Sequence, residues 1–98
     1  MQPHEKLETW RLSRQLVLEL YRATEEFPQG EKYELVSQMR SAAVSVPSQI
    51  AEGAARKSTN EYIHYLYIAR GSLNELRTQI LLSHDLKLLE TPDKTKIC

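Results

Sequence analysis

The chain has 98 residues, 41% of them hydrophobic and 27% charged, which fits one domain and excludes wholesale disorder. Its formal net charge is zero, whereas a dedicated nucleic-acid binder usually carries a basic excess. No apolar run is long enough to span a membrane, and the charged residues 1–10 do not resemble a secretory signal, so we expect a cytoplasmic protein without membrane partners.

The first predicted helix covers about residues 5–27, which contain no internal Gly or Pro. Apolar and small side chains recur there on one helical face, namely Trp10, Val17, Leu20, Thr24 and Phe27. Pro28 and Gly30 then end the helix, because proline disfavours helical geometry in the residue before it and glycine favours a turn.

The second predicted helix covers about residues 31–55. Its apolar stripe consists of Leu35, Met39, Ala42, Ala43, Val46, Ile50 and Ala54. Pro47 lies inside this stripe and removes one backbone donor. Two interpretations stay open, a continuous helix kinked at Pro47 or a break with Ser45 capping a new helix. The stripe continues on both sides of Pro47, which favours the kink.

The third predicted helix covers about residues 59–88 and opens with a capping box, in which Ser58 and Glu61 satisfy each other's backbone donors. Its heptad-like stripe consists of Tyr62, Leu66, Ala69, Leu73, Leu76, Ile80 and Ser83. A second apolar strip consists of Ile63, Tyr67 and Leu81. A helix that is apolar on two sides is usually covered on two sides.

The C-terminal residues 91–98 begin with Thr91-Pro92-Asp93, a typical helix start, but extend for only about one further turn. They therefore predict a stub of a fourth helix. Short turns between consecutive helices predict antiparallel neighbours. The expected fold is all-α, an antiparallel up-down bundle of three long helices and this stub.

No residue pattern predicts catalysis, a metal or a cofactor. His4, His64 and His84 have no second ligand at metal-binding spacing, and Cys98 is the only cysteine. The three glycines form no phosphate-binding loop. Four serines considered as nucleophiles have no histidine nearby in sequence to act as their base, namely Ser41, Ser45, Ser48 and Ser72. We therefore expect a protein that is not an enzyme.

Polar residues accompany the second and third stripes, and they have two possible roles. The set consists of Gln38, Arg40, Ser45, Gln49, Glu52, Ser72 and Glu75. They either form a paired polar network between the helices or a solvated flank. Ala42, Ala43 and Gly71 are small, which predicts close backbone approach nearby.

A weak basic bias marks residues 54–80, which contain Arg56, Lys57, Arg70 and Arg77 against Glu61 and Glu75. These four basic residues are candidates for nucleic-acid contact. A solvated helix face explains them as well, and the zero net charge favours that interpretation.

Several sequence blocks resemble one bacterial family, over about residues 7–89. They are Phe27-Pro28, Glu31-Lys32-Tyr33, Gln38-Met39-Arg40, the run Ser45-Val46-Pro47-Ser48-Gln49-Ile50-Ala51-Glu52-Gly53, and Ala69-Arg70-Gly71-Ser72-Leu73. The serine–aliphatic–proline and Ala-Glu-Gly part is the specific one. In these blocks the chain resembles the four-helix bundle proteins encoded in 23S rRNA intervening sequences.

The resemblance implies a four-helix bundle that assembles as a pentameric ring, with no known biochemical role for most members. It also implies a relation to the accessory protein of diversity-generating retroelements, which binds a reverse transcriptase and nucleic acid. Gln49 stands where the family usually has asparagine, and the fourth helix is reduced to its first turn. We therefore expect a non-catalytic homo-oligomer, with an alternative role as an accessory factor for an RNA or a reverse transcriptase.

Overall fold

The structure, a computed structural model, describes residues 3–32 and 34–88. Its elements are the 3-10 helix η1 (Pro3–Lys6), α1 (Glu8–Thr24), the one-turn α2 (Gln29–Lys32), α3 (Leu35–Ala54) and α4 (Thr59–Asp85). The all-helical prediction is confirmed, and these two ranges contain no strand. The predicted stub, residues 91–98, lies outside the described residues.

The helix ends differ from the predicted ones where single residues leave helical geometry. Leu7 is extended, with φ −78° and ψ 127°, so α1 begins at Glu8 and η1 stands apart from it. Glu34 has φ −111° and ψ −82°, and α3 begins after it, separate from α2. Lys87 takes the left-handed φ of 63°, which stops the third long helix short of residue 88.

The helix α3 is continuous from Leu35 to Ala54 with Pro47 inside it, so the interpretation of a break at Pro47 is wrong. Ser45 caps no helix there. Its hydroxyl instead accepts a hydrogen bond of 2.9 Å from the Ser72 hydroxyl of α4. The predicted cap at Ser58 is confirmed, because its hydroxyl accepts from the Glu61 backbone N–H at 3.1 Å.

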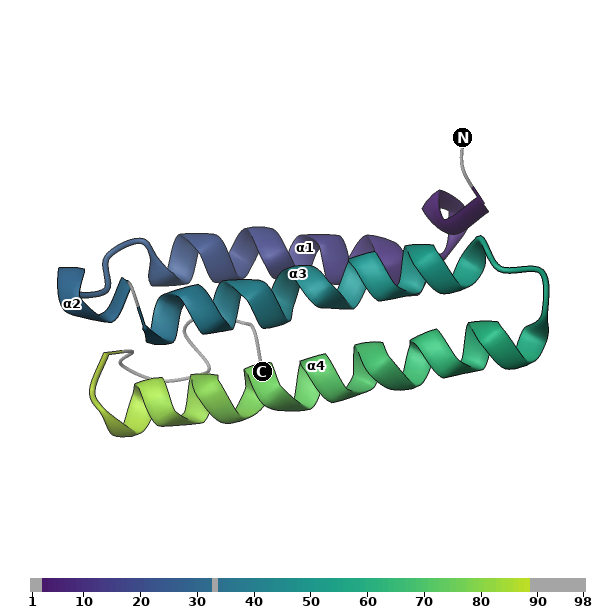
Figure 1. Ribbon diagram of the computed structural model, residues 1–98. Helices are drawn as coiled ribbons and strands as arrows, with labels where there is room; N and C mark the ends of the chain where they lie inside the picture. The colour runs from purple at the N-terminus through teal and green to yellow at the C-terminus, as the bar shows by residue number, and fades with distance from the viewer. Residues whose placement is uncertain (1–2, 33, 89–98) are drawn as a thin grey trace.

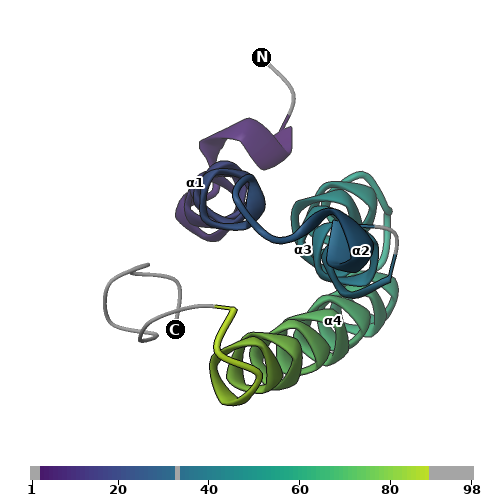
Figure 2. The same cartoon turned by 90° about the vertical axis from the view of Figure 1, so that its left-hand side faces the viewer.

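The three long helices lie side by side along the 44 Å length of the molecule (Figure 1). The turn between α1 and α3 lies at one end and the turn between α3 and α4 at the other. Viewed end-on, α3 lies against both of the other long helices (Figure 2). No Cα atom of α1 lies within 8 Å of a Cα atom of α4, and both helices are described in full. The space between α1 and α4 therefore opens to one side.

The buried residues confirm the predicted helix faces. The larger cluster consists of Leu20, Phe27, Val36, Met39, Ala42, Ala43, Leu76 and Ile80. A smaller cluster, nearer the turn between α3 and α4, consists of Val46, Ile50 and Ala69. Near this smaller cluster Leu66 and Leu73, both on the predicted stripe of α4, stay 37% and 44% exposed. The core is therefore thin at that end of the molecule.

Candidate interaction surfaces

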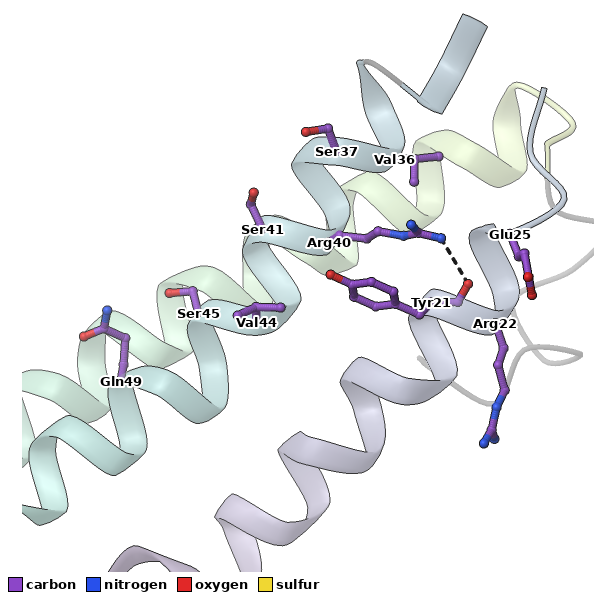
Figure 3. Close-up of a pocket in the computed structure, with 10 residues that line it drawn as sticks. All are labelled: Tyr21, Arg22, Glu25, Val36, Ser37, Arg40, Ser41, Val44, Ser45 and Gln49. Carbon is purple, nitrogen blue, oxygen red and sulfur yellow. Dashed lines mark hydrogen bonds between the residues drawn. The ribbon is translucent and has the colours of Figure 1, made fainter. Parts of the chain in front are cut away.

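The first candidate surface is a groove along the outer side of the α1–α3 pair (Figure 3). Arg40 lies between the two helices, with its guanidinium 4.3 Å from the centre of the Tyr21 ring. Its Nε donates to the Thr24 hydroxyl at 3.1 Å, and its Nη2 donates to the Tyr21 carbonyl at 3.2 Å. Arg40 therefore binds the last turn of α1, where backbone carbonyls lack helical partners.

The rest of this groove offers little chemistry. Ser37, Ser41, Ser45 and Gln49 point outward from the same side of α3, and Arg22 and Glu25 point away from Arg40 (Figure 3). A catalytic site needs a nucleophile or acid within hydrogen-bond reach of a base. The polar side chains that line this groove among the described residues are serines, Tyr21, Arg22, Glu25, Arg40 and Gln49, and Arg40 donates two hydrogen bonds to α1.

The seven polar residues singled out in the sequence do not form one network. The structure joins Ser45 to Ser72 across α3 and α4, and it joins Arg40 to α1. Glu52 pairs with Arg56, and Glu75 accepts from Gln79 within α4 at 3.4 Å. Gln38 is exposed on α3, and Gln49 lines the same groove as Arg40, nine residues further along α3. Of these seven residues, only Ser45 and Ser72 bond to each other across α3 and α4. A separate contact joins the two stripes, because the Ser83 hydroxyl donates to the Met39 sulfur at 3.4 Å.

The four basic candidates divide into two groups. Arg56 is compensated, because it bonds the Glu52 carboxylate and the Tyr65 hydroxyl and lies 4.0 Å from Glu61. Interaction with Tyr65, assisted by Glu52, raises the pKa of Arg56, so this group stays charged. Lys57 is exposed beside it. Arg70 and Arg77 lie apart from them, seven residues from each other on the exposed surface of α4.

The second candidate surface is a groove between α1 and α4, with α3 as its floor. The apolar lining residues are Leu12 and Leu16 of α1, Val46 and Ile50 of α3, and Leu66, Ala69 and Leu73 of α4. Thr9, Ser13 and Arg70 complete the lining. No motif in the sequence predicted this groove, because it depends on the separation of α1 from α4.

The third candidate surface is the opposite side of α4, which we call the outer strip and define as Ile68, Leu82 and Leu86. Their side chains are 38%, 47% and 61% exposed. Residues 68 and 82 are two heptads apart on α4, and Leu86, the residue directly after the helix, follows Leu82 by four positions, so the three side chains lie on one side. The predicted second strip of α4, Ile63, Tyr67 and Leu81, is also exposed.

No cluster of three or more His, Cys, Asp or Glu side chains suited to a metal ion occurs in residues 3–32 and 34–88. No helix in those ranges is both long and apolar enough to cross a membrane.

The described residues form an all-helical protein, and its last long helix, α4, exposes several large apolar side chains. Comparison with known families is more specific. The chain matches the model of the 23S rRNA-intervening sequence protein family over residues 5–98, and it belongs to that family. A search of curated proteins returned no match.

Proposed function

We propose that this member of the family is a non-catalytic, self-associating protein whose long helices form an antiparallel up-down bundle. Exposed apolar area carries the proposal. Twelve large hydrophobic side chains among the described residues are exposed, and seven of them belong to α4. Large exposed apolar side chains gathered on one helix often mark a protein contact, so association is the expected way to cover them.

The free energy at stake is a substantial fraction of the stability of a small domain, which is roughly 5–15 kcal/mol. Fully burying one large apolar side chain contributes roughly 1.5–3 kcal/mol. Each side chain of the outer strip is already partly covered, so each would add about half of that on association. A symmetric assembly repeats the same contact in every copy, so the outer strip of each subunit would be covered in the same way. Family resemblance makes a pentamer the expected closed form.

Light scattering on the purified chain tests this proposal. We expect the mass to be a multiple of the 11.4 kDa chain at micromolar concentrations, with about 57 kDa for five copies. A folded species of 11.4 kDa throughout that range would refute self-association.

A second proposal is that the protein acts as an accessory factor that binds an RNA, alone or with a reverse transcriptase. The observation in its favour is that Arg70 and Arg77 have no ion-pair partner among the described residues. Repetition in an oligomer would add avidity to a patch of only two arginines. Binding of a structured RNA should then weaken steeply with salt and fall in Arg70→Gln/Arg77→Gln. An RNA affinity that changes neither with salt concentration nor in the double variant would contradict this role.

A further inference from the structure

The outer side of α1 carries a hollowed surface, which we call the α1 patch and define as Trp10, Arg11, Arg14 and Leu18. Two hollows meet along it, because Trp10, Arg14 and Leu18 line both of them. The remaining lining residues of the first hollow are Glu5, Arg11 and Gln15. Those of the second are His4, Val17, Val44, Pro47, Ser48 and Ala51, so this hollow lies between η1, α1 and α3.

The α1 patch lies on the opposite side of α1 from the groove between α1 and α4. Leu12 and Leu16 line that groove. Arg14 is two residues from each of them, and two residues turn a helix by about 200°, so Arg14 points the other way. Trp10 and Leu18 are one turn before and one turn after Arg14 and share its side of the helix. The α1 patch is therefore independent of how the α1–α4 groove is filled.

Local contacts orient the two arginines of the α1 patch without neutralising them. The Arg14 guanidinium lies over the Trp10 ring, 5.7 Å from its centre. The Nε of Arg11 donates to the Glu5 carbonyl at 2.8 Å. Both arginine side chains are exposed, and in residues 3–32 and 34–88 neither guanidinium forms an ion pair. The α1 patch therefore offers two positive charges that are already oriented before a ligand binds.

Apolar side chains border these charges. Leu18 is 51% exposed, and Val44, across the second hollow on α3, is 40% exposed. Trp10 packs against the smaller core cluster, which anchors its indole ring. Tryptophan and arginine are enriched at protein interfaces, where such anchored side chains contribute much of the binding energy. A ligand that fits the α1 patch therefore combines negative charge with an apolar side chain.

A peptide fits these features better than a nucleic acid does. Arg14 already lies over the Trp10 ring, which leaves less of the ring for a stacked base. Two arginines neutralise few phosphates, and nucleic-acid affinity depends on many such contacts. From residue 10 to residue 18 a helix rises about 12 Å, a distance that about four residues of an extended peptide span.

We propose that the α1 patch binds an acidic segment of a partner protein, with carboxylates on Arg11 and Arg14 and an apolar side chain between Leu18 and Val44. Charge complementarity selects the segment, and the indole ring of Trp10 holds Arg14 in place. The α1 patch and the outer strip lie on different helices, so this proposal does not depend on self-association.

A fluorescent synthetic peptide tests the α1 patch on the full chain. The probe has about eight residues, which spans the patch with some residues to spare, and it alternates pairs of glutamates with leucines. A second peptide has glutamine in place of every glutamate. Fluorescence anisotropy should show that the acidic peptide binds the wild-type chain at least about tenfold more tightly than the glutamine peptide. This difference should shrink as the salt concentration rises, because both arginines are exposed.

Matched variants locate the binding. Arg11→Gln/Arg14→Gln should weaken the acidic peptide by about tenfold or more. Arg70→Gln/Arg77→Gln removes the same number of charges from the exposed surface of α4 and should leave the affinity within about twofold. Leu18→Glu changes one exposed side chain, keeps both arginines and adds a repelling carboxylate, so it should also weaken binding. Circular dichroism checks that each variant keeps its helix content.

Four results would overturn the proposal. One is an acidic peptide that binds the wild-type chain no more tightly than the glutamine peptide. Another is an equal loss of binding in the α4 variant. A third is a labelled single-stranded RNA that binds more tightly than the acidic peptide and loses its affinity in Arg11→Gln/Arg14→Gln, which would make the patch a nucleic-acid surface. The last is a change of mass in Arg11→Gln/Arg14→Gln by light scattering, which would make the patch a contact between copies.

Discussion

Arg40 is the side chain that joins α3 to the end of α1. It stacks on Tyr21 and hydrogen-bonds the Thr24 hydroxyl and the Tyr21 carbonyl. Because α1 ends at Thr24, the carbonyl of Tyr21 is one of the last four, which lack a helical backbone N–H partner, and it accepts from the Thr24 hydroxyl at 3.3 Å as well as from Arg40. A planar guanidinium can donate to two acceptors while it stacks, which a lysine ammonium cannot do.

We therefore expect Arg40→Lys to lower the free energy of unfolding by about 1–2 kcal/mol. Urea denaturation followed by circular dichroism measures the change. Arg22→Lys is the matched control, since Arg22 is exposed in the same groove and points away from Arg40 (Figure 3). Equal unfolding midpoints for the two variants would show that the guanidinium geometry of Arg40 does not matter.

Lys87 is a second residue with a defined local role, at the end of α4. Its φ is 63°, its N–H donates to the His84 carbonyl at 2.9 Å, and the Leu88 N–H donates to the Ser83 carbonyl at 2.8 Å. This pair of bonds is a Schellman motif, whose left-handed position usually holds glycine. Leu88 then packs on the larger core cluster.

Replacing Lys87 with glycine should stabilise the protein by roughly 0.5–1 kcal/mol, because a side chain at positive φ is strained. Thermal melting would detect this as a rise in Tm. Lys57→Gly is the control, because Lys57 does not have a positive φ and glycine there only adds freedom to the unfolded chain. A fall in Tm for Lys87→Gly would contradict this account of the turn.

At the scale of elements, Gly53 and Gly71 differ in how closely other side chains approach them. A Cβ added to Gly53 of α3 would lie 2.8 Å from the Cβ of Tyr65 and 3.0 Å from Cδ1 of Tyr62. A Cβ added to Gly71 would meet nothing within 4 Å. A close approach of α3 and α4 therefore occurs at Gly53, whereas Gly71 itself is open. Next to Gly71, Ser72 bonds Ser45 across the two helices.

Alanine substitutions at these two positions should change the free energy of unfolding in opposite directions. Gly53→Ala should destabilise the protein by about 1–3 kcal/mol, since a Cβ contact with a rigid backbone-linked atom forces the helices apart. Gly71→Ala should stabilise it by about 0.5–1 kcal/mol, because alanine is the better helix former at an exposed position. Denaturant titrations of the two variants measure both changes. If both variants changed the free energy of unfolding in the same direction, this assignment would be wrong.

The elements also show which features a sequence can predict. The helical faces of α1 and α3 follow from local periodicity, and the cap at Ser58 follows from a four-residue pattern, so these predictions are confirmed. The bonds from Arg40 to Thr24 and Tyr21 join residues 16 and 19 positions apart, and no local pattern encodes them. Gly53 and Gly71 both lie inside a long helix, so the local sequence does not distinguish them. They differ in whether side chains of a neighbouring helix lie within 4 Å of an added Cβ.

At the scale of the whole molecule, the exposure of α4 depends on how three helices are spaced. Periodicity places Leu66, Leu73, Leu76 and Ile80 on one stripe, yet only the last two are buried. The stripe follows from the sequence, whereas the groove follows from the distance between α1 and α4. The outer strip is exposed on the other side of α4, away from this groove, and it is the surface to which we assign contact between copies.

Light scattering of the outer-strip variant Ile68→Lys/Leu82→Lys beside the wild-type chain tests the central claim most directly. Charged side chains on a buried interface are costly, so we expect the wild type to assemble and the variant to run as a helical monomer of 11.4 kDa. Leu66→Lys/Leu73→Lys, on the groove side of the same helix, should keep the wild-type mass. Wild type and outer-strip variant with the same mass would contradict the account.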